Sequence, residues 1–466
     1  MAILSLSVSA VYGQEPLPSV DYSTYYGGTG TDDADVVAID PFGNIYLGCH
    51  STSPSLPGVN ENHFTLKGGM DAFVVKLNEK GSEVGYVTHL GGANWDAVQG
   101  LVSDSAGSIY AIGTTYSEDF PIDPNGFQST FAGESDAFVL KLNTNGEVVW
   151  STFLGGSGDE DGRGIIVDRH GVIHIIGRTK SNDFPTVAGA LQPQSAGGVD
   201  AFIATLDPDG KVIASTYLGG AEDDIGFAIA LDSVGRRYIT GTTNSADFPV
   251  RNGVQMTHNG ENDLFVVVVD SMGSNLEFAS YLGGSGADQA YSLALGPAGD
   301  IYVMGVTNSP DLPATKGAFQ QEPAGERDAF VARLNLQTRS LVYATYVGGE
   351  NDDNPRNLVV DSAGRAWIVG NTSSHNFPVL SKQNTAVRGR ADAFVTILDP
   401  TGELLEYSTL LGGDGFEIFE GAALGADGSL TVSGLTDSAN FPRVNPLQHN
   451  FMGGRFDIVV ARFTMP

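Results

Sequence analysis

The chain has 466 residues, 61 of them glycine without a triplet repeat, which excludes a collagen-like fibre and favours short strands joined by tight turns. Lys and Arg total 24 against 55 Asp and Glu, and this formal net charge of −31 argues against nucleic acid and anionic membranes as partners. The single cysteine, Cys49, excludes an internal disulfide and a cysteine-based zinc site.

The first residues form a short apolar run that ends in small residues. This run resembles the hydrophobic and cleavage parts of a secretory signal peptide, without its positively charged start. We therefore expect residues 1–20 to be a signal-peptide remnant or a flexible tail, and the protein to be secreted, periplasmic or at the cell surface. No other stretch is long and apolar enough to span a membrane, so membrane insertion is not expected.

Residues 21–466 are predicted to form one domain, because a single repeat runs through them. Successive Gly-Gly pairs are 64 or 65 residues apart, and a proline and an aspartate beside an aromatic residue recur in step with them. The pairs are Gly27-Gly28, Gly91-Gly92, Gly155-Gly156, Gly219-Gly220, Gly283-Gly284, Gly348-Gly349 and Gly412-Gly413.

Each unit is predicted to hold four strands, a to d, separated by glycine turns and by one longer loop between b and c. In the fourth unit these strands are residues 224–232, 238–243, 264–269 and 276–281. The chain starts with a lone strand d at residues 22–26 and ends with a lone strand c at residues 457–463. This pattern predicts an all-β, seven-bladed β-propeller of four-stranded antiparallel blades, closed by pairing N-terminal strand d with C-terminal strand c.

Several phrases of the repeat resemble a known family. Tyr-Ser-Thr-Tyr-Tyr-Gly-Gly, Gly-Asn-Ile-Tyr, Asp-Phe-Pro and Asp-Ala-Phe-Val are similar to the bacterial seven-bladed β-propeller repeat, or SBBP repeat, over nearly all of residues 22–463. The resemblance implies an exported or surface-attached bacterial protein. It implies no general enzymatic activity and no set of catalytic residues.

An acidic residue stands four positions after every Gly-Gly pair, in the loop that leads into strand a. Converging carboxylates suggest a calcium site, whereas the structural alternative, which we favour, is that each acid accepts bonds from its own loop. Two hydroxyl columns, exemplified by Thr243 and Ser245, are expected to tie the b–c loop in the same way. The seven acids are Asp32, Asp96, Glu160, Asp224, Asp288, Asp353 and Glu417.

Three positions after each acid, early in strand a, the repeat varies instead. This column mixes both charges with two aromatic residues, and its place on an inner strand indicates the mouth of the central channel. It is our predicted ligand-contact set, with the alternatives that it is only the variable wall of a solvated channel or is buried between blades. The seven residues are Asp35, Gln99, Arg163, Phe227, Tyr291, Arg356 and Glu420.

The sequence favours a non-catalytic scaffold that binds a protein or glycan partner at the end of the channel, with Ca2+ as a possible aid. The b–c loops are uniform in length, and no blade carries the long insertion that often builds an enzyme pocket. One alternative is a propeller lyase or hydrolase at the channel mouth, which a deep polar pocket containing Arg163, Tyr291 and Arg356 would favour. Another is a structural component of the cell envelope.

Overall fold

The structure, a computed structural model, describes residues 18–58, 66–381 and 386–464. Most of the predicted signal-peptide segment, residues 1–17, therefore lies outside the described residues. Every regular element within them is a β-strand, and there are 28 strands. The described part of the chain has no helix with the length and hydropathy needed to cross a membrane.

The strands form seven four-stranded sheets, which we number as blades 1 to 7. Blades 1 to 3 comprise β2 (Asp32–Ile39), β3 (Ile45–Ser51), β4 (Asp71–Leu77) and β5 (Val84–Leu90); β6 (Asp96–Ser103), β7 (Ile109–Thr115), β8 (Asp136–Leu142) and β9 (Val148–Leu154); and β10 (Glu160–Val167), β11 (Ile173–Thr179), β12 (Asp200–Leu206) and β13 (Val212–Leu218). Blades 4 and 5 comprise β14 (Asp224–Leu231), β15 (Arg237–Thr243), β16 (Asp263–Val269) and β17 (Leu276–Leu282); and β18 (Asp288–Leu295), β19 (Ile301–Thr307), β20 (Asp328–Asn335) and β21 (Ser340–Val347). Blades 6 and 7 comprise β22 (Asp353–Val360), β23 (Ala366–Thr372), β24 (Asp392–Leu398) and β25 (Leu405–Leu411); and β26 (Glu417–Leu424), β27 (Leu430–Thr436), β28 (Asp457–Thr464) and β1 (Ser19–Tyr26).

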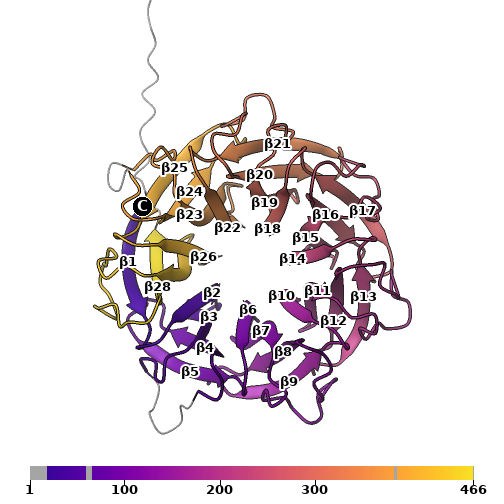
Figure 1. Cartoon of the computed structure of the whole chain (residues 1–466), viewed down its shortest axis with the longest axis horizontal. Helices are drawn as coiled ribbons and strands as arrows, with labels where there is room; N and C mark the ends of the chain where they lie inside the picture. Colours follow the sequence, from indigo (N-terminus) through magenta and orange to yellow (C-terminus); the bar gives the residue numbers. More distant parts are fainter. Residues whose placement is uncertain (1–17, 59–65, 382–385, 465–466) are drawn as a thin grey trace, which may run out of the picture.

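The seven blades stand in a ring around a central opening, which confirms the predicted seven-bladed β-propeller (Figure 1). The first strand of each blade, from β2 to β26, lies next to the opening, and the fourth lies at the rim. Blade 7 joins the two ends of the described chain, because β1 pairs antiparallel with β28 from Ser19↔Thr464 to Tyr26↔Ile458.

The apolar core lies between neighbouring blades. Seven clusters of buried side chains each combine residues of two adjacent blades. One example packs Tyr110 and Ile112 of blade 2 against Ile173 and Phe202 of blade 3. Since the middle strands are covered on both faces, they are almost continuously apolar, as in β16, all seven residues of which are buried. This packing positions the inner strands around the opening.

Candidate functional site

Each inner strand carries a β-bulge at the variable column. The pairing of β10 with β11 passes from Gly162 to Gly164, so Arg163 has no partner in the ladder. The same shift occurs at Gln99, Phe227, Tyr291, Arg356 and Glu420, and in blade 1 it spans Ala34 and Asp35. A bulge bends the strand and redirects the side chain of its extra residue.

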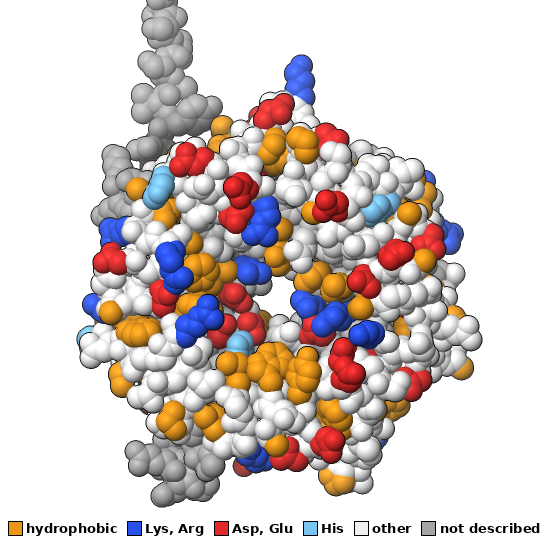
Figure 2. Space-filling model, in the orientation of Figure 1, with side chains coloured by type: hydrophobic (Ala, Val, Ile, Leu, Met, Phe, Trp, Pro, Cys, Tyr) orange, Lys and Arg blue, Asp and Glu red, His pale blue; other side chains and the backbone are white. Residues whose placement is uncertain are grey.

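The seven bulge residues line one cavity of about 340 Å3 at the centre of the ring. The structure thus brings the predicted ligand-contact set together, although ligand binding by it remains a prediction. The lining also includes small or apolar neighbours such as Gly100 and Ile165. Figure 2 looks down the opening and shows acidic, basic and hydrophobic side chains gathered around it.

Blades 3 to 6 place two guanidinium groups and two aromatic rings in an unbroken arc. The Arg163 Cζ lies 4.7 Å from the centroid of the Phe227 ring, and the Arg356 Cζ lies 5.1 Å from that of Tyr291. The two rings are 6.1 Å apart between centroids. Each arginine is thus held by a cation–π contact, which fixes its position at the cavity wall.

Each arginine of this arc has at least one guanidinium nitrogen without a hydrogen-bond partner among the described residues. The Nε atoms of Arg163 and Arg356 are buried and have no hydrogen-bond partner among the described residues. Arg163 donates through a terminal nitrogen to Asp161 at 2.6 Å, and Arg178 Nε donates to the same oxygen at 3.2 Å. Burial raises the pKa of Asp161, but these two arginines and a Thr114 hydroxyl outweigh it and hold the pKa below its usual value.

Blades 7 and 1 form an acidic side of the cavity. Arg356 Nε lies 3.9 Å from Glu420 Oε1, and Glu420 lines the cavity together with Asp35. The His50 ring on β3 lies between two carboxyl groups of β2, with Nδ1 3.3 Å from Asp35 Oδ2 and Nε2 3.7 Å from Asp33 Oδ2. The cavity is therefore polarised, with arginines and aromatic rings on one side and carboxyl groups on the other.

The charges on the acidic side are strongly interdependent. Burial lowers the pKa of His50, but the nearby Asp35 and Asp33 outweigh it and raise the pKa to about 9. Burial and repulsion by Asp35 raise the pKa of Asp33 to about 7, and burial and both aspartates raise that of Glu420 well above its usual value. Burial acts against ionisation of Asp35 too, yet His50 keeps its pKa below the usual value.

The seven acids of the repeated column are not brought together. Each is fully buried in its own blade, at the start of an inner strand. In blade 5, Asp288 accepts bonds from the Gly284 N–H at 2.7 Å and the Ser309 hydroxyl at 2.8 Å, and also from the Thr307 hydroxyl. Donors thus occupy the Asp288 oxygens, whereas Oδ1 of Asp224 and Oδ1 of Asp353 have no hydrogen-bond partner among the described residues. Metal binding by this column remains a prediction.

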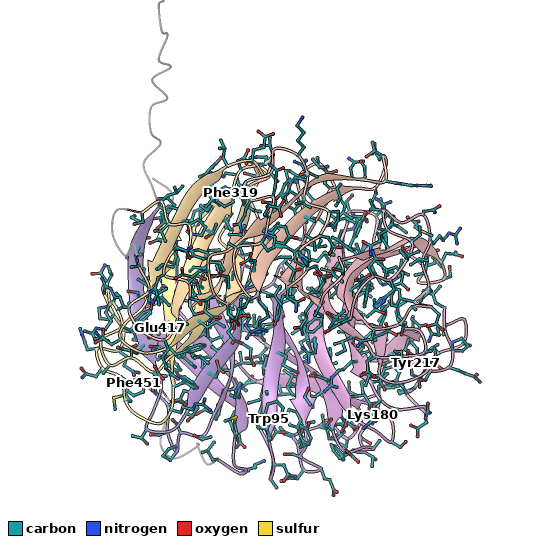
Figure 3. The ribbon with its side chains drawn as sticks, turned by 45° about the horizontal axis from the view of Figure 1, so that its top comes forward. Trp95, Lys180, Tyr217, Phe319, Glu417 and Phe451 are labelled. Atoms are coloured by element: carbon teal, nitrogen blue, oxygen red, sulfur yellow. The ribbon has the colours of Figure 1, made fainter. Side chains whose placement is uncertain are left out.

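An exposed aromatic pair in blade 2 lies beside His50, at the acidic side of the cavity. The rings of Trp95, just before β6, and Tyr116, just after β7, meet edge to face at 5.7 Å between centroids, and the Trp95 ring is 6.1 Å from the His50 ring. Trp95 is labelled in Figure 3, as is Lys180, the residue after β11.

Sequence reasoning left Asp33, His50, Asp161 and Arg178 out of the ligand-contact set. The strand register shows why these four residues belong beside the set. Asp33 is paired with His50 across β2 and β3, and Asp161 is paired with Arg178 across β10 and β11. These positions hold apolar or neutral residues in other blades, for example Ile225 opposite Thr242 in blade 4. A search for charged cross-strand pairs next to the variable column would have found them.

Comparison with known proteins identifies the repeat. The beta-propeller repeat model SBBP matches four segments, residues 149–185, 215–249, 277–313 and 342–378. Each segment runs from the outer strand of one blade, through a Gly-Gly pair, to just beyond the second strand of the next blade.

Related proteins are distant in sequence. The regulatory protein FlaEY of Caulobacter vibrioides is 24% identical over 412 residues, which are 83% of this chain and 41% of that protein. The chain thus spans less than half the length of this relative.

Solved structures with similar folds include a protein of unknown function from Dyadobacter fermentans, with a TM-score of 0.46, 12% identity and coverage of 97% of this chain and 100% of that one. They also include the Pan2 WD40 domain of Neurospora crassa, with a TM-score of 0.45 and 10% identity. That match covers 94% of this chain and 90% of the Pan2 chain. BamB from Moraxella catarrhalis has a TM-score of 0.38 and 13% identity, and the match covers 92% of this chain and 84% of the BamB chain.

Proposed function

Because the chain carries SBBP beta-propeller repeats, we propose that it is an exported binding scaffold that takes an acidic group of a glycan or protein partner into the end of its central channel. Export, as expected from the sequence, remains part of this proposal. The relative FlaEY is named a regulatory protein, which supports a binding role over a purely structural one.

One observation carries the proposal: a position at which the repeat mixes both charges with aromatic residues is also a position at which all seven blades meet in one cavity. Elsewhere the repeated glycines, hydroxyl groups and buried acids build the same blade seven times. A residue needed to build a blade would be expected to recur in every blade. The variable column therefore has the distribution of a binding site placed on a repeated scaffold.

An acidic group fits the basic side of the cavity. The two stacked arginines carry Nε–H groups without hydrogen-bond partners among the described residues, and a carboxylate, sulfate or phosphate would supply acceptors for their guanidinium groups. The flanking Phe227 and Tyr291 rings offer flat apolar faces against which a sugar ring or a side chain packs. The polar and aromatic lining thus suits a small charged group attached to a larger ligand.

The larger part of the partner would lie on the surface around the channel. The exposed Trp95–Tyr116 pair lies close to His50, at the acidic side of the cavity. Tyr and Trp are enriched where proteins bind partners, because each combines a large apolar face with a polar group. A glycan chain or a protein segment that enters the cavity would extend across this pair.

An array of oligosaccharides and peptides tests the proposal, with each acidic member matched by a neutral one of equal length. We expect binding to acidic members and at least tenfold weaker binding to their neutral counterparts, because only the former pair with Arg163 and Arg356. Equal binding to both classes, or binding to neither, would contradict the proposal.

Calcium assistance is a separate prediction from the sequence. Thermal unfolding of the chain in EDTA and then in millimolar calcium tests it, since an ion bound only by the folded state raises Tm. No rise in Tm would leave the seven buried acids with a structural role alone.

A second candidate function is an enzyme, and the presence of Arg163, Tyr291 and Arg356 in one polar cavity favours it. A lyase acting on an acidic polysaccharide would remove the proton next to the carboxylate and expel the neighbouring glycosidic oxygen, leaving a carbon–carbon double bond. Tyr291 would exchange the proton, and Arg356, which stacks on its ring, would bind the carboxylate. Incubation with polyuronates tests this through the appearance of unsaturated ends, which the Tyr291→Phe variant should not produce.

A further inference from the structure

Blade 1 has metal-ligating residue types at three neighbouring positions beside the channel. Asp33 on β2 faces His50 on β3, and Asp35 occupies the bulge of β2. The position of His50 is occupied by Thr114 in blade 2 and Thr242 in blade 4. Two carboxyl groups and an imidazole therefore meet in this blade, although the repeat does not need them to build a blade.

The three side chains are close enough to hold one ion. One nitrogen of His50 and one oxygen each of Asp33 and Asp35 all lie within 4.8 Å of one another. The side chains of His50 and Asp33 are only 14% and 17% exposed, and Asp33 Oδ1 is buried without a hydrogen-bond partner among the described residues. This is the one group of three or more metal-ligating side chains at such distances within residues 18–58, 66–381 and 386–464.

The donor set selects the kind of ion. Calcium and magnesium take oxygen ligands almost exclusively, whereas an imidazole nitrogen combined with carboxylates suits zinc and other first-row transition metals. Three protein ligands with a remaining position open to solvent is the arrangement of zinc sites that bind a water or a substrate. Here the open position would face the cavity, since Asp35 lines it.

We propose that Asp33, Asp35 and His50 form a binding site for a divalent first-row transition metal, with Zn2+ as the ion that fits the donor set. Glu420 of blade 7, which lines the cavity together with Asp35, would orient that ligand. The metal would add a cationic group on the acidic side of the cavity. This inference is independent of the proposed binding of an acidic partner, which depends on Arg163 and Arg356.

The opposing model is an ion pair in which a protonated His50 bridges the two aspartates. The contacts of 3.3 Å and 3.7 Å between its ring nitrogens and the carboxylates fit such a pair as well. The two models differ in an observable way, because a metal ligand must have a free nitrogen lone pair and a purely ionic bridge binds no metal. Metal titration therefore separates them.

Isothermal titration of the EDTA-treated, desalted full chain with zinc chloride is the test. We expect one Zn2+ per chain, and at least tenfold weaker binding by His50→Thr, since Thr is the residue of blades 2 and 4 at this position. The matched control is His170→Gln, at an exposed turn residue, which should bind Zn2+ like the wild type. No zinc uptake by the wild type, or equal uptake by His50→Thr, would overturn the proposal.

Cobalt substitution keeps the test decisive if His50→Thr does not fold. Co2+ bound by one nitrogen and two carboxylates in the wild type should give visible absorption bands that zinc removes by displacement. Asp35→Asn should weaken them at least tenfold while leaving the far-ultraviolet circular dichroism unchanged. Absence of such bands from the folded wild type, or calcium binding as tight as zinc binding, would refute a transition-metal site.

Discussion

Two buried carboxyl groups flank the first glycine of a Gly-Gly pair. In blades 4 and 5, a Cβ atom on Gly283 would lie 2.3 Å from Asp263 Oδ1 and 2.8 Å from Asp288 Oδ2, so only glycine allows this approach. Asp263 accepts a bond from the Asn259 N–H, but its Oδ1 has no partner among the described residues. Burial, with repulsion from Asp288, raises the pKa of Asp263 to about 7.

These raised pKa values predict that the folded protein is more stable in mild acid than in mild alkali. Burial raises the pKa of Asp136 to about 7 and those of Asp96 and Asp224 to about 6, from 3.8. A group whose pKa is raised by folding contributes stability that is complete below its unfolded pKa and is lost as the pH rises through the folded one. We expect the Tm to fall as the pH rises from about 4 to about 8.

The Asp263→Asn variant separates this effect from the general loss of net charge. Asparagine keeps an acceptor for Asn259 and cannot ionise, so the variant should be more stable than the wild type near pH 8.5 by about 1–3 kcal/mol, because one pKa unit is worth about 1.4 kcal/mol. The difference should shrink as the pH falls below about 7 and should approach zero only below about pH 4, near the ordinary pKa of an aspartate. A wild type that remains the more stable at both ends of this pH range would contradict this assignment.

At the scale of a strand, the second strand of most blades has a glycine at the point where the backbone of the innermost strand comes closest to it. A Cβ atom on Gly241 would lie 2.1 Å from the carbonyl oxygen of Ile225 and 2.3 Å from the ring of Phe265. Blade 1 has Cys49 at this position, and there β2 and β3 lose the ladder pair that Gly226 and Gly241 form in blade 4. The glycine thus sets the distance between the two inner strands.

Gly241→Ala should therefore destabilise the propeller. Backbone of β14 blocks the new methyl group, so the strands must separate, and we expect a loss of at least about 2 kcal/mol in the free energy of unfolding. Gly69→Ala is the matched control, because a Cβ atom there meets nothing within 4 Å and its effect should stay within about 0.5 kcal/mol. Similar losses in both variants would contradict the packing argument.

The strands were predictable in position but not in register. The fourth blade was predicted as residues 224–232, 238–243, 264–269 and 276–281, and the observed strands differ by one residue at most at each end. Glycine turns and the repeated proline mark where strands stop, and these are local features of the sequence. A bulge such as that at Phe227 depends on the mismatch between two paired strands, which no local pattern encodes.

At the scale of the whole molecule, repeat number and strand order were enough to predict the ring and the column at its centre. The contacts that give the cavity its chemistry were not predictable in the same way. The stacking of Arg163 on Phe227 joins blades 3 and 4, and the His50 contacts depend on how β2 bulges beside β3. Such contacts follow from side-chain packing between elements, so they required the three-dimensional structure.

The central claim is that Arg163 and Arg356, in the cavity lined by the seven bulge residues, bind the partner's acidic group. Isothermal titration with the acidic oligosaccharide or peptide that binds best on the array tests it most directly. The Arg163→Gln/Arg356→Gln double variant should bind at least 100-fold more weakly, because charge-assisted bonds at both stacked arginines are lost. The control Arg236→Gln, an arginine paired with Asp232 outside the cavity lining, should bind like the wild type. Unchanged affinity in the folded double variant would place the binding site outside the channel and contradict the account.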